Sequence, residues 1–90
     1  MQAERELRLE VAAAQARADA ATALVRRTRA AASVAGTVLA EKPADAVMCH
    51  QHAGALLMAG MGYRVSGQAN EAADYLRRYK EEADALASPR

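Results

Sequence analysis

An uncharged run of eleven residues, Ala53–Tyr63, constrains the fold of this chain more than any other segment. The run is apolar on nearly every side, yet it is well short of the roughly 20 residues that a helix needs to cross a bilayer. Its surface must therefore be covered by protein, which predicts a buried central helix. Gly60 and Gly62 each weaken that helix by about 1 kcal/mol, which predicts that other helices pack closely against them.

The positions of the helix breakers predict an all-α fold. The two prolines are Pro43 and Pro89, alanine occupies 25 of the 90 positions, and Phe and Trp are absent. Because alanine is the best helix former and proline the strongest breaker, we expect helices and no strands. A chain of 90 residues has room for one domain with a small core.

A long helix over residues 1–42 is expected first, followed by an antiparallel helical hairpin over residues 43–87. No proline interrupts the first segment, and its end is marked by Lys42, which precedes Pro43. Proline disfavours helical geometry at the residue before it and suits the first turn of a new helix. The order of these segments predicts three helices in a single helical domain spanning residues 1–90.

The second helix is predicted to run from Pro43 to Val65, with Asp45 in its first turn near the positive end of the helix dipole. Gly67 is suited to the positive φ angle of a helix end. The third helix is expected from Ala69 to about Ala87, and residues 88–90 are expected to form a loose tail.

Two apolar rows with a period of seven residues run along the first helix, as in a coiled coil. One row is Val11, Ala18, Val25, Ala32 and Leu39, and the other is Leu7, Ala14, Ala21, Thr28 and Ala35. A third row, which predicts packing on a globular core, is Leu24, Ala31 and Val38.

The later helices are each about half as long as the first, so roughly the first 20 residues have nothing in this chain to lie against. They can pair with a second copy, dock on another protein or stay unsupported. We favour pairing, because an unsupported helix of this length is barely stable in water. The predicted oligomerisation residues are Leu7, Val11, Ala14, Ala18, Ala21 and Val25.

The predicted hairpin carries four residues at fixed spacings: Gly60, Tyr63, Gly67 and Ala72. In these residues, the segment 56–76 resembles the tetratricopeptide repeat, a helical hairpin with a glycine, an aromatic residue, a turn glycine and an alanine at these positions. Leu56, Ala59 and Leu76 differ from the repeat by residue type, and Tyr79 stands where a small residue is usual. The resemblance implies one degenerate, repeat-like hairpin.

The residues that carry chemistry do not assemble into a recognisable site. Cys49, His50 and His52 form the one cluster suited to a metal, but a structural zinc site needs four ligands, so we expect neither a metal nor a cofactor. A site shared across a homodimer through Cys49 and His52 stays open as an alternative. Phosphate-binding loops, paired carboxylates and Ser-His-Asp sets are missing, so we do not expect an enzyme or catalytic residues.

These observations predict a small non-catalytic protein–protein interaction module. An adaptor or chaperone of this kind receives a partner helix in an apolar groove, as expected of small secretion chaperones with similar hairpins. Large side chains that supply contact area are the predicted contact residues: Leu56, Tyr63, Tyr75 and Tyr79. The alternative is a small dimeric regulator that binds nucleic acid through arginines: Arg26, Arg27, Arg29, Arg64, Arg77 and Arg78.

The net charge and the cysteine content limit the possible ligands, disulfides and cellular location of the protein. A net charge of +1 gives no overall attraction to nucleic acid or to an anionic membrane, and a single cysteine excludes an internal disulfide. The charged segment Met1–Glu10 lacks the apolar core of a secretory signal, so a cytoplasmic protein without membrane insertion is expected. We expect a homo- or hetero-oligomer of bacterial origin, because the richness in Ala and Arg suits a GC-rich genome.

Overall fold

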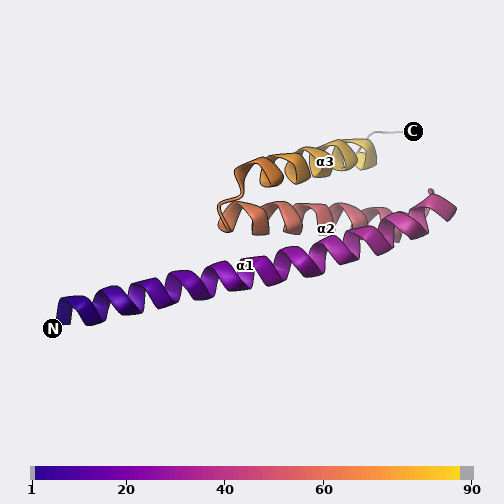
Figure 1. Ribbon diagram of the computed structural model, residues 1–90. Helices are drawn as coiled ribbons and strands as arrows, with labels where there is room; N and C mark the ends of the chain where they lie inside the picture. Colours follow the sequence, from indigo (N-terminus) through magenta and orange to yellow (C-terminus); the bar gives the residue numbers. More distant parts are fainter. Residues whose placement is uncertain (1, 88–90) are drawn as a thin grey trace.

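A computed structural model describes residues 2–87, and over this range it contains three helices and no strand (Figure 1). The helices are α1 (Gln2–Glu41), α2 (Ala46–Val65) and α3 (Ala69–Ala87). The predicted all-α fold, with a long first helix and a following helical hairpin, is confirmed. The predicted tail at residues 88–90 lies outside the described residues.

The central helix is α2, and α1 and α3 pack on its two sides (Figure 1). The molecule measures 64 × 21 × 18 Å. Its length is that of α1, because 40 residues at about 1.5 Å per residue span roughly 60 Å. Burial along α1 begins at Ala21, and residues 2–17 are all exposed. We call residues 2–20, which project past the hairpin in Figure 1, the N-terminal arm.

The core consists of two small clusters in which side chains from α1, α2 and α3 meet. Val25, Tyr63 and Ala72 form the first cluster. Ala32, Ala55 and Leu56 form the second cluster. Tyr75 packs against both clusters, and Tyr79 packs against the second. α1 therefore closes over the hairpin and completes its core.

Two glycines of α2 allow the close packing that the sequence predicts. A Cβ atom on Gly60 would lie 2.8 Å from both Cγ and Cδ2 of Leu76 on α3. A Cβ atom on Gly62 would lie 2.7 Å from Cγ2 of Val25 and 3.3 Å from the carbonyl oxygen of Ala21. The separations of 2.7 and 2.8 Å are shorter than real Cβ atoms show, so α2 approaches both neighbours at positions where it has no side chain.

The start of α2 differs from the prediction, because the helix begins at Ala46 and Pro43 lies in the preceding turn. Asp45 is the N-cap residue and does not belong to the first turn. Its backbone is extended, with φ −70° and ψ 103°, and its Oδ1 atom accepts a hydrogen bond of 3.1 Å from the amide of Met48. The N-cap carboxylate accepts a hydrogen bond from an amide of the first turn that has no partner within the helix. The helix therefore begins at the residue after the cap, Ala46.

The Asp45 cap gives a first test of stability. We expect Asp45→Ala to lower the free energy of unfolding by about 1 kcal/mol, because the amide of Met48 loses its acceptor. Urea denaturation followed by circular dichroism measures this loss. Asp45→Asn is the matched control, since asparagine caps nearly as well; an equal loss in both variants would contradict the capping role.

The turn between α2 and α3 agrees with the prediction for Gly67. This residue has a φ of +81°. Its amide donates to the carbonyl of Arg64 over 3.2 Å, and the amide of Gln68 donates to the carbonyl of Tyr63 over 2.9 Å. This pair of hydrogen bonds is the Schellman motif, which requires a left-handed residue at the position that Gly67 occupies.

Among residues 2–87, none of the helices combines the length and the apolar character that crossing a membrane would require.

Candidate functional site

Two of the four predicted contact residues lie inside the core. Leu56 has no exposed surface, and Tyr63 is 7 % exposed. Ala32 of α1 lies in the cluster of Leu56, and Val25 lies in the cluster of Tyr63. The groove that the sequence assigns to a partner helix is thus filled by α1 of the same chain, so Leu56 offers no surface to a partner and Tyr63 offers very little.

The other two predicted contact residues are half-buried. Tyr75 stacks obliquely on Tyr63, with ring centroids 5.4 Å apart and an angle of 39° between the planes. Tyr79 lines a hollow of about 400 Å³ between α2 and α3, together with Leu57 and Leu86. Tyr79 therefore reaches a surface cavity, whereas Tyr75 mainly joins the two clusters of the core.

The predicted oligomerisation residues divide into two groups. Leu7, Val11 and Ala14 are exposed, and Ala18 is half-buried. Ala21 and Val25 are buried, because Gly62 of α2 lies directly against them. The two rows to which they belong are therefore covered by this chain after Ala18 and are exposed before it.

A polar cleft of about 340 Å³ lies beside Tyr75, where side chains of all three helices meet. Arg29 of α1 donates to the hydroxyl of Tyr63 over 3.1 Å. The guanidinium carbon of Arg78 lies 4.9 Å from the ring centre of Tyr75. His52 of α2 lies with Nδ1 2.7 Å from one carboxylate oxygen of Glu82 and 2.8 Å from the other.

Each basic side chain of this cleft already has a partner in the fold. Attraction to the oxygens of Tyr63 and then Tyr75 raises the pKa of Arg29 above its usual value, so this side chain stays charged. The cation–π contact of Arg78 with Tyr75 lies within α3, whereas the pair of His52 with Glu82 joins α2 to α3. The cleft can neutralise an anionic group, but its basic side chains already take part in contacts within and between the helices.

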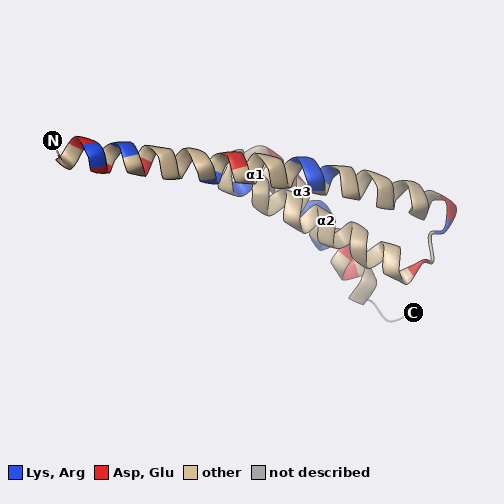
Figure 2. Cartoon of the chain, turned by 90° about the horizontal axis from the view of Figure 1, so that it is seen from below, with Lys and Arg blue, Asp and Glu red and all other residues tan. Residues whose placement is uncertain are grey.

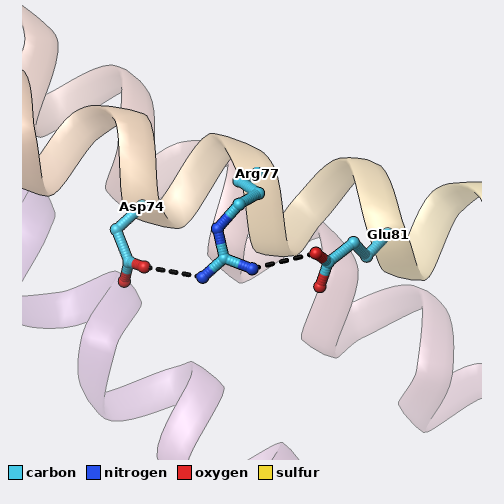
Figure 3. Close-up of polar contacts among 3 residues, drawn as sticks. All are labelled: Asp74, Arg77 and Glu81. Carbon is cyan, nitrogen blue, oxygen red and sulfur yellow. Dashed lines mark hydrogen bonds and ion pairs between the residues drawn. The ribbon is translucent and has the colours of Figure 1, made fainter.

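The remaining arginines do not gather on one surface. Arg77 donates to Asp74 over 2.8 Å and to Glu81 over 2.9 Å on the outer face of α3 (Figure 3). The hydrogen bond with Asp74, followed by the one with Glu81, raises the pKa of Arg77. Basic residues are spread along α1 and over the hairpin (Figure 2). This arrangement lends little support to the nucleic-acid alternative.

The candidate metal ligands are also separated. The thiol of Cys49 points to the carbonyl of Pro43, 3.7 Å away, whereas His52 points to Glu82. Over residues 2–87, no three His, Cys, Asp or Glu side chains come together as a metal site would need.

The most apolar hollows lie between α1 and α2, and no α3 residue lines them. One hollow, of about 310 Å³, is lined by Arg17, Ala20, Ala21, Leu24, Met58, Met61, Gly62 and Val65. The other, of about 420 Å³, is lined by Ala30, Ala31, Val34, Ala35, Val38, Met48 and Gln51. We call the surface formed by these residues the open α1–α2 face.

The open α1–α2 face exposes four large apolar side chains: Val34, Met58, Met61 and Val65. From Ala46 to Tyr63, α2 contains no Asp, Glu, Lys or Arg, and it is drawn almost wholly in tan in Figure 2. Contiguous exposed apolar surface on a small protein marks an interaction site, and flexible methionines suit surfaces that adapt to a partner. The open α1–α2 face is therefore the strongest candidate site.

Sequence reasoning assigned this face to the core. The third apolar row of α1 predicts burial, but in the structure Ala31 is exposed and Leu24 and Val38 are only half-buried. α1 and α3 pack on two sides of α2, and residues 2–87 contain no fourth helix. One side of the α1–α2 pair is therefore left uncovered. The width of the apolar stripe on α1 is the sequence feature that indicates an additional apolar surface. Only the position of α3 shows which side of the α1–α2 pair stays exposed.

No protein family model, no curated protein and no solved structure matches the chain.

Proposed function

We propose that this chain is a non-catalytic protein–protein interaction module, an adaptor or chaperone, that receives a partner helix on the open α1–α2 face. One observation carries the proposal: two apolar hollows lie between the same two helices, with Val34, Met58, Met61 and Val65 exposed beside them. A helix laid along this face would complete a four-helix arrangement around α2. Its apolar side chains would enter the hollows, as in other helix-in-groove complexes.

The composition of the face favours protein over other ligands. Its charged lining residue is Arg17, at one end of the first hollow. A phosphate-rich ligand needs several cations, and Arg77 is already paired with Asp74 and Glu81. The proposed setting is cytoplasmic. The resemblance to the tetratricopeptide repeat fits this role, and so does a likeness to small secretion chaperones.

Binding of a model helix tests the proposal. The probe is a fluorescein-labelled amphipathic helical peptide of about 20 residues, with leucines spaced i, i+3 and i+7. We expect Met61→Glu to weaken the binding of this peptide about tenfold or more, because a carboxylate would have to be buried against apolar side chains. Fluorescence anisotropy gives the Kd.

Leu9→Glu is the matched control, since Leu9 is also an exposed apolar residue but lies on the N-terminal arm, away from the open α1–α2 face. Equal affinity of Met61→Glu and the unaltered chain would contradict the proposed site. The affinity should hold when salt rises from about 0.1 M to about 0.5 M, because apolar contacts are not screened. Binding of a DNA duplex that fell steeply over that range, with no peptide binding, would favour the nucleic-acid regulator instead.

A further inference from the structure

Where α1 and α2 pack on each other, the two helices carry positive charges that no carboxylate of theirs offsets. Residues 20–40 of α1 and residues 46–65 of α2 contain no Asp or Glu. They carry four arginines: Arg26, Arg27, Arg29 and Arg64. The eleven acidic residues of the chain lie on the N-terminal arm, around the α1–α2 turn and on α3. The net charge of +1 therefore conceals a basic pair of packed helices.

Two of the arginines that border the open α1–α2 face belong to α1. Arg17 lines the first hollow. Arg27 is exposed and lies one helical turn after Leu24 of the first hollow and one turn before Ala31 of the second. Its place on α1 is therefore between the two hollows. Arg17 and Arg27 are ten residues apart, which is about 15 Å along the helix axis.

The third bordering arginine is Arg64, in the last turn of α2. It follows Met61 by three residues and directly precedes Val65, and both of these line the first hollow. We call Arg17, Arg27 and Arg64 the arginine border. Within the described part of the chain, these three side chains form no ion pair and no side-chain hydrogen bond. Their charges are therefore open to another molecule.

We propose that the partner helix of the open α1–α2 face is acidic along the side that meets the arginine border. This inference rests on the proposed function and adds the chemistry of the partner. Apolar side chains of the partner would enter the hollows, and carboxylates about three turns apart would face Arg17 and Arg27. Three turns of a helix return a side chain to the same side after eleven residues. Such carboxylates would neutralise charges that the fold leaves unpaired.

The shape of the face favours a helix over an anionic membrane, which is the other ligand that an apolar surface with basic residues beside it can bind. The hollows of about 310 Å³ and about 420 Å³ lie between two helices, so they suit single projecting side chains. A bilayer surface has no such projections at fixed positions. An amphipathic helix has them and also holds its carboxylates at a fixed spacing.

Three forms of the model helical peptide test the charge preference. Their leucines are identical, and the residues that flank the leucine stripe are all Glu, all Gln or all Lys. At about 0.1 M salt, we expect the Glu form to bind about fivefold or more tightly than the Lys form, because each exposed ion pair contributes a factor of roughly 1.4 to 5. At about 0.5 M salt this ratio should fall, while the affinity of the Gln form holds. Equal affinity of the Glu and Lys forms at the lower salt would overturn the proposal.

Arg27→Glu tests whether the preference arises at the arginine border. This substitution should lower the ratio of Glu-form to Lys-form affinity about threefold or more. Arg26→Glu is the matched control, because it makes the same change in net charge at an exposed neighbour about 100° around α1, on the side away from α2 and the open face. It should change the ratio much less, since salt screens the more distant charge. Equal effects of the two variants would overturn the proposal.

The acidic partner and the proposed function can fail separately. Met61→Glu should weaken the binding of the Gln form, which depends on apolar contacts alone. If it does so while the Glu and Lys forms bind equally, the proposed function stands and the acidic partner is wrong. Binding of none of the forms would contradict the proposed function itself. Binding to phosphatidylserine vesicles without binding of any peptide would assign the face to a membrane surface and contradict both.

Discussion

Replacing Leu56 with alanine is expected to lower the free energy of unfolding by about 2–5 kcal/mol, the largest loss that any single truncation in this chain should cause. Leu56 is the largest side chain with no exposed surface, and it belongs to the cluster that joins Ala32 of α1 to Ala55 of α2. Its removal leaves a cavity lined by small residues, Tyr75 and Tyr79, which have little freedom to fill it. A domain of this length has roughly 5–13 kcal/mol of stability in total, so the loss is a large share.

Thermal unfolding followed by circular dichroism measures this effect, and we expect the melting temperature to fall by roughly 10 °C or more. Leu9→Ala is the matched control, because the same chemical change at an exposed position should stay within about 0.5 kcal/mol of the unaltered chain. Leu56→Met keeps the volume and should cost less than about 1.5 kcal/mol, which keeps the test informative if the alanine variant does not fold. Similar losses for Leu56→Ala and Leu9→Ala would contradict the position of the core.

The second large effect is expected at Gly60, where alanine should destabilise the fold even though it favours helices. The new Cβ atom would lie 2.8 Å from Cγ of Leu76 and 3.4 Å from the backbone nitrogen of that residue. Relief requires α3 to move, because the Cγ atom is near the backbone and cannot rotate far away. Overpacking of this kind costs about 1–3 kcal/mol, which outweighs the gain of up to about 1 kcal/mol in helix propensity.

Gly54 offers a matched control on the same helix. A Cβ atom there would meet nothing within 4 Å, so Gly54→Ala should raise the free energy of unfolding by about 0.5–1 kcal/mol. Urea denaturation should therefore give changes of opposite sign for the two Gly→Ala substitutions. A gain in stability at both positions would show that α3 does not pack against Gly60 as described.

Gly60→Ala and Gly54→Ala show which features of the packing can be predicted from the sequence and which cannot. Glycines inside an apolar helix predict close packing, and Gly60 and Gly62 confirm it against Leu76 and Val25. The sequence does not say that Gly54 faces open space, because all three glycines lie in the same uncharged segment. The three glycines differ in whether a neighbouring helix contacts them. Such contacts depend on how the helices cross, which is a property of the tertiary structure.

The candidate site was less accessible to sequence reasoning than the fold. Leu56 and Tyr63 are large apolar residues on a hairpin, and large apolar residues serve a core as readily as a binding surface. Which role they take depends on whether α1 lies in the hairpin groove, and it does. The exposed residues Met58 and Met61 belong to the same helix and have the same character, so composition does not separate them from the core residues.

The sequence by itself determined that this chain is helical, where its helices end and that the first helix is too long for the other two to cover. These properties depend on local preferences: the alanine content, the positions of Pro43 and Gly67, and the heptad rows of α1. Only the tertiary structure decided which apolar face is buried and which is open. Several faces of an alanine-rich helix are almost equally apolar, so packing selects between them. α3 covers one side of α2 and α1 fills the hairpin groove, which leaves the open α1–α2 face and residues 2–17 of the N-terminal arm exposed.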